Sequence, residues 1–458
     1  MKNNTSEFTI NGYSLEELTE GTITFHYSLR HGLDEYDFFE DVLFDPKKVN
    51  LPAISQGLLK NVCDNLSMFL ALSYWKLYAP KKINILNNFL TQQQAEFWNS
   101  VYTKGMGEFY FKNKIDFRGL VSIPFDESAL ANRVREPRAD RSLLLIGGGK
   151  DSLASAELLM AGGKKFTGFM MNIAKPQVDT IKTIGCESIA VIKKISPNLL
   201  ELNKRDDVYN GHVPISLGYT LCALLACVLF DYRYIIASNE ITASYGNTEY
   251  LSMDINHQWT KSLEFERMIQ QYIHEFITPD VTYFSLLRPF HEIGIVQYFA
   301  KHPKYFMAFS SCNRNFRMTQ EKPRTGWCNE CAKDPFAFLL LACFLTKEQV
   351  MEIFGENLLD KPSAENTYRE LLGLENIKPF ECVGTPEETA VAFYLIYKKG
   401  EYKNDHNMKM FVDEVLPRIE EKIEDMKKNV FSRGSEHMIP DEFVGLLDQM
   451  SQNSHETL

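Results

Sequence analysis

Three features that would assign this 458-residue chain to a familiar class are missing, and the first is a basic tract. The formal net charge is −11, whereas proteins that bind DNA or RNA need clustered Lys and Arg to neutralise phosphates. We therefore expect no nucleic-acid partner. The densest basic group is diluted by two acids, and it is either a solvated linker or a contact for a phosphorylated substrate. It consists of Arg133, Arg135, Arg138 and Arg141.

The chain also lacks a disulfide framework and a membrane-spanning run. Its nine cysteines are odd in number and scattered, unlike those of a small secreted domain. Residues 1–7 have no apolar core for a signal peptide. The longest mostly apolar run without a charge, residues 213–230, only reaches the lower limit for a membrane span and predicts a buried helix. We expect a cytoplasmic protein without a membrane segment.

The most informative stretch of the chain is a glycine turn between a strand pattern and a helix pattern. Residues 143–146 are apolar, Gly147, Gly148 and Gly149 follow, and residues 151–161 have amphipathic spacing. Glycine allows close approach of a phosphate, and a helix N-terminus offers free N–H groups and partial positive charge. Lys150 adds a charge and the Ser152 hydroxyl a hydrogen-bond donor. This arrangement predicts an anion site.

The spacing around Lys150 excludes the commoner phosphate loop, which ends in Gly-Lys-Ser or Gly-Lys-Thr. Here Asp151 follows Lys150, and the sequence Gly-Gly-Gly-Lys-Asp-Ser resembles the pyrophosphate loop of N-type ATP pyrophosphatases, usually Ser-Gly-Gly-x-Asp-Ser. Those enzymes cleave ATP to AMP and pyrophosphate. Gly147 stands where serine is usual, so one hydroxyl contact is missing. The alternative is a glycine turn without a ligand, but strand, helix and Lys-Asp-Ser in register favour a nucleotide.

Strand and helix patterns alternate in the middle of the chain, which predicts an α/β fold with a doubly wound parallel sheet. Ligands of such sheets lie at the carboxyl ends of the strands. Asn172, residues 238–240 and residues 310–312 follow predicted strands, so we expect them to converge on residues 147–152. The predicted strands are 143–146, 166–171, 188–192, 234–237, 281–286 and 306–309, and the predicted helices are 151–161, 176–184, 213–231, 259–276 and 291–301.

Different patterns flank this middle region on both sides. Towards the N-terminus, residues 8–10 and 22–27 alternate like strands, and residues 58–77 and 91–104 have helical spacing. The sequence therefore predicts a mixed α+β region at 1–135, a nucleotide-binding domain of the ATP-pyrophosphatase (HUP-like) type at 136–345, and a helical domain at 346–458 with a frayed tail. The predicted helices of the last domain are 347–354, 364–372, 387–397 and 408–426.

Polar residues after the predicted strand 234–237 are further candidates for chemistry. Glu240 could bind Mg²⁺ or a substrate amine, and Asn239 could contact substrate, although both could equally cap a turn. His257 and Lys261 lie four residues apart, with Glu264 close behind. His257 could carry a proton, or it could be a packing or capping histidine.

A cysteine pair later in the chain has the spacing of a metal knuckle. Cys328 and Cys331 are separated by two residues, as in many zinc sites, and Cys312 is a plausible third ligand. The sequence does not identify the fourth ligand. Asp334 stands where many such sites have a cysteine, and zinc sites with three sulfurs and one carboxylate are less common. A redox-active pair or plain reduced thiols are the alternatives.

Taken together, these residues resemble one family over most of the chain, the UDP-N-acetyl-α-D-muramoyl-L-alanyl-L-glutamate epimerases of peptidoglycan synthesis. Asn329 stands where glycine is common, and residues 332–334 where Pro-Lys-Cys is common, so the departures concern the metal ligands. The matching stretches are Leu-Ser-Tyr-Trp-Lys at 72–76, Gly-Met-Gly-Glu-Phe-Tyr-Phe-Lys-Asn at 105–113, the loop at 147–152, Ser-Asn-Glu at 238–240, Asn-His-Gln at 256–258, Ser-Leu-Glu-Phe-Glu at 262–266, Leu-Arg-Pro at 287–289, Ser-Cys-Asn at 311–313 and Trp-Cys-Asn-Glu-Cys at 327–331.

The resemblance implies an ATP- and Mg²⁺-dependent epimerase that inverts the terminal L-Glu of UDP-MurNAc-L-Ala-L-Glu through an acyl-adenylate. Lys150 and Asp151 would then act in catalysis within the ATP loop at 147–152, and Glu240 would serve Mg²⁺ or substrate. For the α-proton transfer the candidates are His257, Glu264 and Cys312. Arg288 or the basic group at 133–141 would meet the UDP diphosphate or the glutamate side chain.

Two other functional classes remain open. The cysteine knuckle also fits ATP pyrophosphatases of tRNA thiolation or deazapurine nitrile synthesis, but the acidic balance argues against tRNA. A scaffold that binds a nucleotide without turnover is the second alternative, and the retained Lys150, Asp151 and Ser152 argue against it. The sequence leaves zinc occupancy and oligomeric state undecided.

Overall fold

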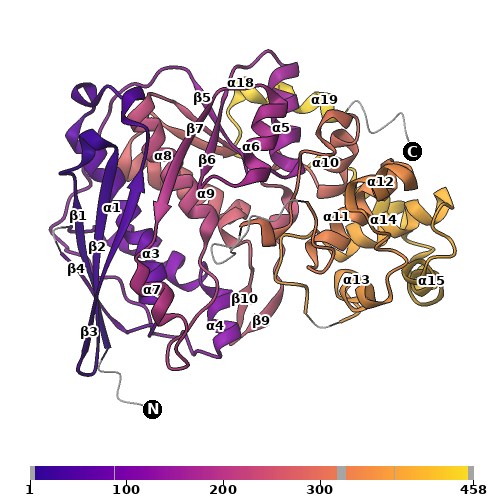
Figure 1. The fold of residues 1–458 in the computed structure, drawn as a ribbon, viewed down its shortest axis with the longest axis horizontal. Coiled ribbons are helices and arrows are strands. Elements are labelled where there is room, and N and C mark those ends of the chain that lie inside the picture. Colours follow the sequence, from indigo (N-terminus) through magenta and orange to yellow (C-terminus); the bar gives the residue numbers. More distant parts are fainter. Residues whose placement is uncertain (1–5, 87, 317–325, 376, 452–458) are drawn as a thin grey trace.

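The fold is a nine-stranded mixed sheet with helices on both faces and a helical C-terminal region beside it (Figure 1). The computed structural model describes residues 6–86, 88–316, 326–375 and 377–451. Residues 452–458, predicted as a frayed tail, lie outside this part of the chain. The strand order is β11-β8-β5-β6-β7-β3-β2-β1-β4.

Five parallel strands form the half of the sheet that was predicted as doubly wound. They are β5 (Ser142–Leu145), β6 (Thr167–Met171), β7 (Ser188–Lys194), β8 (Tyr234–Ala237) and β11 (Thr282–Ser285). The chain starts in the middle at β5, moves outward through β6 and β7, and then crosses to β8 and β11 on the other side. The order therefore reverses beside β5, which is where sheets of this class bind ligands.

The sixth predicted strand, residues 306–309, is wrong. These residues continue a 3₁₀-helical turn at Pro303–Tyr305, and the amide of Phe309 donates to the carbonyl of Tyr305. Phe306 and Phe309 are apolar because they are buried against the C-terminal helices. The next residue still reaches the expected place, since the amide of Ser310 donates to the carbonyl of Gly148 over 3.0 Å.

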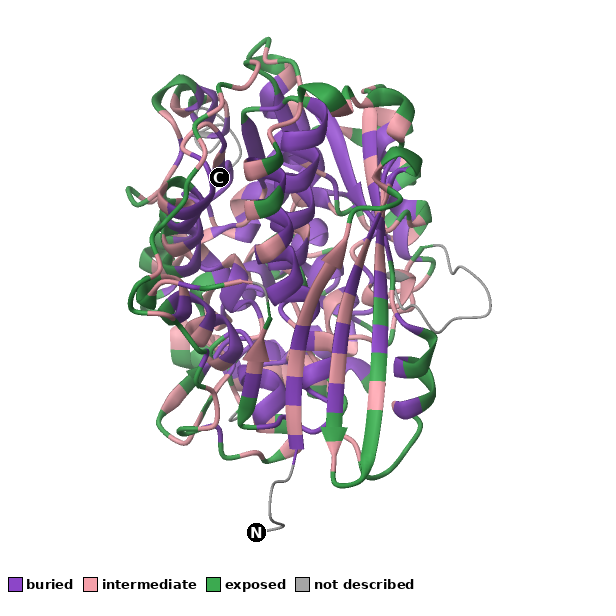
Figure 2. Cartoon of the chain, turned by 90° about the vertical axis from the view of Figure 1, so that its left-hand side faces the viewer, coloured by how far each residue is buried: buried purple, intermediate pink, exposed green. Residues whose placement is uncertain are grey.

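The N-terminal strands extend the same sheet, so the sheet as a whole is mixed and not parallel throughout. They are β1 (Ser6–Ser14), β2 (Thr22–His31), β3 (Asp34–Leu43) and β4 (Lys82–Ile85). The first three form an antiparallel meander, and β3 pairs antiparallel with β7. Figure 2 shows buried residues alternating with less buried ones along these strands, as expected for a sheet with one covered face. The predicted boundary at residue 135 remains a prediction.

Helices cover both faces of the parallel half. Leu143 and Ile235 point into one core, shared with α1, α8 and α9, while Leu144 and Ile236 point into another, shared with α5 and α10. The run predicted as a buried helix is α8, and no helix among the described residues is long and apolar enough to cross a membrane. The bounds are α1 (Gln56–Leu70), α5 (Lys150–Ala161), α8 (Ile215–Phe230), α9 (Leu263–Tyr272) and α10 (Glu292–Phe299).

Shorter elements complete the α/β part. The predicted helix 259–276 is interrupted, because the Ser262 hydroxyl accepts from the Phe265 amide and starts α9 there, after a 3₁₀ turn at Trp259–Lys261. The other elements are α2 (Leu72–Trp75), α3 (Gln92–Thr103), α4 (Gly107–Asn113), α6 (Lys175–Ile184), α7 (Pro197–Leu202), β9 (Thr248–Tyr250) and β10 (Met253–Ile255).

The C-terminal region is helical, as predicted, but residues 408–426 do not form one helix. A π-helical turn at Phe411–Val415 and Pro417 in the first turn of the next helix divide this stretch. After α17 the chain returns to the sheet, and Ile439, Phe443 and Leu446 pack in the core that α5 covers. The helices are α11 (Lys333–Phe344), α12 (Lys347–Phe354), α13 (Glu365–Leu371), α14 (Pro386–Lys399), α15 (His406–Met410), α16 (Leu416–Ile419), α17 (Ile423–Val430), α18 (Asp441–Val444) and α19 (Asp448–Ser451).

Candidate active site

The glycine turn after β5 leads directly into the N-terminus of α5, as the sequence predicts. Gly148 has a φ of +83°, and a Cβ there would lie 2.9 Å from the carbonyl carbon of Pro176. A Cβ on Gly149 would lie 2.8 Å from the hydroxyl oxygen of Ser311. A Cβ on Gly147, by contrast, would meet nothing within 4 Å. The glycine turn therefore presents bare backbone beside the free N–H groups at the start of α5. A phosphate fits such a place.

Lys150 opens α5 and lies between two carboxylates. Its Nζ is 2.5 Å from Oδ1 of Asp151 and 2.6 Å from Oε2 of Glu292, the first residue of α10. Burial alone would lower the pKa of Lys150, but Asp151 and Glu292 outweigh burial and hold it above its ordinary value. Lys150 therefore places a positive charge directly after the glycine turn, where the two carboxylates hold it. Ser152 donates to the carbonyl of Gly149 over 3.0 Å.

A third carboxylate makes this neighbourhood strongly acidic. Glu240, which follows β8, is 4% exposed, and burial followed by the charge of Asp151 raises its pKa. Burial also raises the pKa of Glu292, to about 8, with Glu240 and Asp151 adding to the effect against Lys150. Crowded carboxylates of this kind are stabilised by a cation.

The three carboxylates beside the loop do not form a ready-made metal site. Among the described residues, two groups of three or more His, Cys, Asp or Glu bring their ligand atoms together, and Asp151, Glu240 and Glu292 are not one of them. Mg²⁺ commonly takes only one or two carboxylates and completes its shell with water and substrate phosphates. One or two of these carboxylates would therefore suffice for Mg²⁺ only where a bound ligand completes its shell.

Arg288 lies behind Glu240 and donates to protein groups, while its contact with a substrate remains a prediction. Its side chain is fully buried, its Nε donates to Glu266 over 2.8 Å, and Nη1 and Nη2 donate to the carbonyls of Glu240 and Lys261 over 2.6 Å each. The guanidinium thus holds the backbones of Glu240 and Lys261 side by side. Asn239 is similarly tied to the end of β11, since it donates to the Ser285 hydroxyl over 2.9 Å.

The basic group at 133–141 does not meet the glycine loop either. Arg138 and Arg141 precede β5, at the amino ends of the parallel strands, while the loop follows the carboxyl end. Arg141 stacks on Tyr232 at 4.0 Å and donates to the carbonyl of Phe230, and Arg138 pairs with Glu136 at 2.5 Å. Arg133 and Arg135 are exposed. The linker interpretation fits these placements.

His257 lies in a second group of titratable side chains. Its Nδ1 binds Oε2 of Glu108, on α4, and Nδ1 of His212 is 3.4 Å from the same oxygen. Burial lowers the pKa of His257, but Cys382 and Glu108 outweigh burial and raise it to about 9. Burial and the charge of His257 lower the pKa of His212 to about 3. The surroundings thus favour the charged form of His257 and the neutral form of His212.

Glu264 is not part of this group. It is 2.5 Å from Nζ of Lys104 and accepts from Nε1 of Trp259 over 2.9 Å, and its side chain is 51% exposed. Its contacts are therefore those of a surface ion pair. This placement does not suit the proton-transfer role that the sequence left open for it.

Three further charged or nucleophilic residues lie near these groups, although no sequence motif points to them. They are Glu292, Lys378 and Cys382. Nζ of Lys261 donates to Sγ of Cys382 over 3.2 Å. Lys378 is 8% exposed, and its Nζ has no hydrogen-bond partner. Cys382 and Lys378 lie in the segment before α14, outside the predicted nucleotide-binding domain at 136–345, and no motif spacing marks them.

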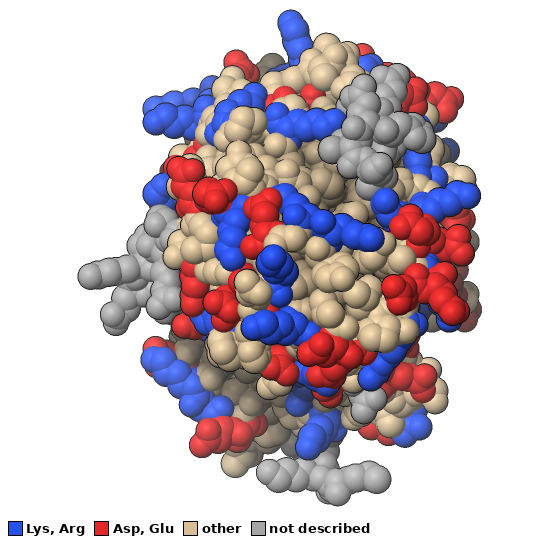
Figure 3. Space-filling view, turned by 90° about the vertical axis from the view of Figure 1, so that its right-hand side faces the viewer, with Lys and Arg blue, Asp and Glu red and all other residues tan. Residues whose placement is uncertain are grey.

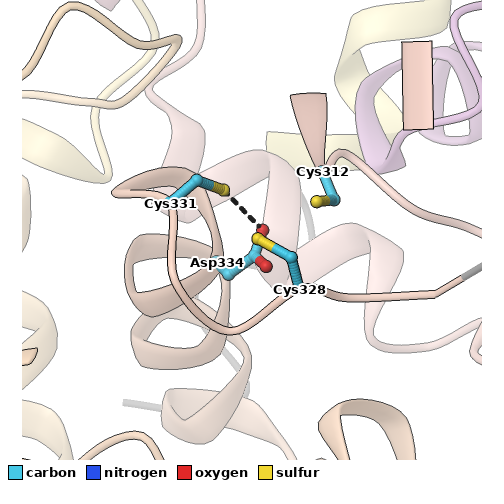
Figure 4. A group of neighbouring side chains, drawn as sticks. All are labelled: Cys312, Cys328, Cys331 and Asp334. Atoms are coloured by element: carbon cyan, nitrogen blue, oxygen red, sulfur yellow. Dashed lines mark hydrogen bonds between the residues drawn. The ribbon is translucent and has the colours of Figure 1, made fainter. Parts of the chain in front are cut away.

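The predicted metal knuckle is assembled, with Asp334 as its fourth member. The three sulfurs of Cys312, Cys328 and Cys331 and an oxygen of Asp334 lie within 4.8 Å of one another (Figure 4). Asp334 is fully buried in the first turn of α11, and its Oδ1 accepts from Cys331 over 3.0 Å. Four ligands of this kind fit tetrahedral zinc. In this cluster Cys312 is a metal ligand candidate, and this competes with the proton-transfer role.

The outer face of the C-terminal helices carries mixed charge. Figure 3 shows Lys and Arg interspersed with Asp and Glu over this face, with uncharged surface between them. Among the described residues on this face, no continuous basic surface for a nucleic acid is visible.

Comparison with known proteins adds independent findings. Residues 1–286 match a family model described as the MurL N-terminal domain, and residues 308–427 match the MurL C-terminal domain. No solved structure gives a significant match.

Three curated relatives carry the same description, UDP-N-acetyl-α-D-muramoyl-L-alanyl-L-glutamate epimerase. The protein of Xanthomonas oryzae pv. oryzae is 34% identical over 371 residues, which cover 81% of each chain. That of a Micromonospora strain is 32% identical over 444 residues, 96% of this chain and 98% of the relative. That of Salinispora tropica is 32% identical over 411 residues, 89% of this chain and 88% of the relative.

Proposed function

Because the chain belongs to the MurL family, the epimerases of UDP-MurNAc-L-Ala-L-Glu in peptidoglycan precursor synthesis, we propose that it activates the terminal glutamate with ATP before inverting its α-carbon. The observation that carries this proposal is the loop from Gly147 to Ser152 at the reversal point of the sheet. Such a loop, at the N-terminus of a helix, suits the pyrophosphate of a nucleotide.

The chemistry explains why a nucleotide would be consumed. Removing the α-proton next to a free carboxylate produces a dianion, which is a very unstable intermediate. Transfer of AMP to that carboxylate removes its negative charge and lets the acyl group behave as an ester. The α-carbon becomes acidic enough for a side chain to deprotonate it, and hydrolysis afterwards releases AMP.

Lys150 would stabilise the pyrophosphate that leaves. Its ammonium group is held at the N-terminus of α5 by Asp151 and Glu292. Phosphate oxygens at Gly148 and Gly149 would meet both the helix N–H groups and this cation, and fixed charges of this kind stabilise developing negative charge. Bound Mg²⁺ would supply further neutralisation, held by Asp151 and Glu240.

We also propose that the four-residue cluster binds structural zinc. The ion would join the loop at Cys312 to the start of α11 at Asp334. Since Ser310 hydrogen-bonds the carbonyl of Gly148, a firm anchor at Cys312 would steady the glycine loop from outside. A zinc site with four protein ligands is closed, and it would take no part in proton transfer.

We place the reaction in the cytoplasm. All nine cysteines are free, which is expected where thiols stay reduced. Three of them, Cys312, Cys328 and Cys331, would need to remain reduced to hold zinc.

The proposal is tested by incubating the protein with UDP-MurNAc-L-Ala-L-Glu, ATP and Mg²⁺ in D₂O. We expect D-Glu with deuterium at the α-carbon, and AMP and pyrophosphate that form only when the muropeptide nucleotide is present. Chiral analysis and mass spectrometry report the first two, and a coupled phosphate assay reports the third. Inversion at the same rate without ATP would refute the activation step.

A further inference from the structure

Cys382 lies beside two cationic side chains. Nζ of Lys261 donates to its sulfur over 3.2 Å, and the imidazole of His257 interacts with the same sulfur. The segment that carries it is held in place by Asn247, whose side chain donates to the carbonyl of Pro379 over 2.7 Å. The sulfur therefore has fixed partners on the sheet side of the molecule.

These partners favour the thiolate. Burial alone would raise the pKa of Cys382, but Lys261, Lys333 and His257 outweigh burial and place it well below its ordinary value. In Cys222 and Cys227, burial raises the pKa instead. Low-pKa thiols in electropositive, partly accessible places are the reactive ones.

His257 is held in the orientation that serves Cys382. Its Nδ1 binds the buried carboxylate of Glu108, which fixes the ring and keeps it charged. The carboxylate of Glu108, the imidazole of His257 and the sulfur of Cys382 thus interact one after another. Relays of this kind activate nucleophiles and bases. We regard Glu108 and His257 as positioning residues for the sulfur.

Lys261 connects Cys382 to the nucleotide loop. Its carbonyl and that of Glu240 accept from the same Arg288 guanidinium. Burial lowers the pKa of Lys261, but Cys382, Glu240 and Asp151 outweigh burial and raise it. The thiolate and the acidic residues beside the loop thus share one cation, and they belong to one site.

Lys378 indicates that this site takes an anion. It is 8% exposed, and its Nζ has no hydrogen-bond partner and lies 5.8 Å from the centroid of the Tyr245 ring. Burial lowers its pKa, and the negative charges of Glu388, Glu292, Glu240 and Cys382 oppose that effect only in part. A buried ammonium group without a partner is costly unless a ligand supplies one. An acyl oxygen or side-chain carboxylate of the substrate has the required charge.

We propose that Cys382 is the catalytic base that removes the α-proton of the activated glutamate, with His257 and Glu108 as its positioning residues. This inference rests on the proposed function, because the α-proton becomes acidic only after adenylylation.

The proton balance is simple. The C–H bond breaks, its proton moves to Sγ of Cys382, and its electron pair moves onto the acyl group as an enolate beside Lys378. Reprotonation of the α-carbon on the opposite face, with a proton from solvent, gives the D-configuration. The thiol then loses its proton to solvent and becomes a thiolate again, so no oxidant or reductant is needed.

The test separates activation from proton transfer in Cys382→Ser, with Cys186→Ser as the matched control. Cys186 is a partly buried free cysteine outside the site. We expect Cys382→Ser to keep substrate-dependent pyrophosphate release within about 3-fold and to lose α-deuterium exchange by about 100-fold or more, the usual contribution of a general base. Cys186→Ser should keep both.

Other outcomes overturn the inference. Exchange in Cys382→Ser within about 3-fold of the unsubstituted protein would show that another group is the base. Loss of pyrophosphate release together with exchange, in a variant with unchanged circular dichroism, would assign Cys382 to substrate binding. If the unsubstituted protein itself released no pyrophosphate, the proposed function would fail, which is a distinguishable result.

A second measurement needs no variant. Iodoacetamide at neutral pH should alkylate Cys382 faster than Cys186, as counted on tryptic peptides by mass spectrometry, because only the thiolate reacts. UDP-MurNAc-L-Ala-L-Glu with ATP and Mg²⁺ should protect Cys382 and leave Cys186 unaffected. Equal labelling of the two cysteines, or no protection, would contradict a thiolate in the substrate site.

Discussion

At the scale of single residues, the glycine loop offers two neighbouring positions with opposite tolerance. A Cβ on Gly148 would come within 2.9 Å of the Pro176 backbone at a φ of +83°, whereas Gly147 has open space. We predict that Gly148→Ala lowers substrate-dependent pyrophosphate release by about 100-fold or more, because the loop must move away from the phosphate position.

Gly147→Ala is the matched control for that variant. Nothing lies within 4 Å of its added Cβ, so activity should stay within about 3-fold of the unsubstituted protein. Gly147→Ser should behave likewise, with room for the hydroxyl that related loops carry there. Equal losses in Gly147→Ala and Gly148→Ala would show that the loop does not bind phosphate as described.

Lys150 provides a second prediction at this scale. Lys150→Met leaves Asp151 and Glu292 without their cation, and removing one partner of a buried pair costs about 3–5 kcal/mol of unfolding free energy. Lys150→Met with Glu292→Gln should recover part of that loss in a denaturation experiment. Neither variant should release pyrophosphate. Activity in the double variant would remove Lys150 from the mechanism.

The residues of the site were only partly predictable. Lys150, Asp151 and Ser152 follow one another in a recognisable order, and Cys328 and Cys331 have a diagnostic spacing. Glu292, Lys378 and Cys382 have no such order, because only the packing of the C-terminal segment on the sheet brings them in. The protein partners of Arg288 are likewise hidden from the sequence, which cannot show that its guanidinium donates to Glu266, Glu240 and Lys261.

At the scale of elements, the cluster at the start of α11 joins two loops. We predict about one zinc per chain by elemental analysis, and a lower melting temperature after removal by a strong chelator. Asp334→Ala should lose the metal, whereas Asp334→Cys should retain it with a full set of sulfur ligands. Full metal content in Asp334→Ala would show that the carboxylate is not a ligand.

The strands of the parallel half were predictable because each is a short apolar run next to a helical pattern. The turn after Pro303 was not, since Phe306 and Phe309 are equally apolar for a different reason, burial under the C-terminal helices. The stretch 408–426 has helical spacing throughout, but Pro417 and a π-helical turn divide it. A local sequence pattern shows which residues form an apolar face, but it does not show which distant element covers that face.

At the scale of the whole molecule, one ion pair crosses the join between the two halves of the sheet. Glu40 of β3 is fully buried, and its Oε1 is 2.9 Å from Nζ of Lys193 on β7. Glu40→Ala should lower the unfolding free energy by about 3–5 kcal/mol, because it leaves Lys193 buried without a partner. Chemical denaturation measures this change.

Glu35→Ala is the control on the same strand. Glu35 is exposed, and replacing it should change stability by less than about 0.5 kcal/mol. A similar small change in Glu40→Ala would contradict a tight join between β3 and β7.

The continuity of the sheet is the part of the architecture that the sequence concealed. The alternation in residues 22–27 predicts a strand with one covered face, but nothing local indicates that β3 pairs with β7, some 150 residues later. Register between distant strands is set by packing, which no short motif records. The family resemblance, in contrast, was carried by short motifs and is confirmed over most of the chain.

The central claim is that ATP activates the carboxylate next to the carbon that is inverted. The most direct measurement uses substrate whose glutamate α-carboxylate carries the heavy isotope of oxygen, with mass analysis of the AMP released. Adenylylation and hydrolysis at the acyl carbon should transfer one heavy oxygen to AMP for each turnover. AMP without heavy oxygen, formed while the α-carbon inverts, would contradict adenylylation followed by hydrolysis at the acyl carbon.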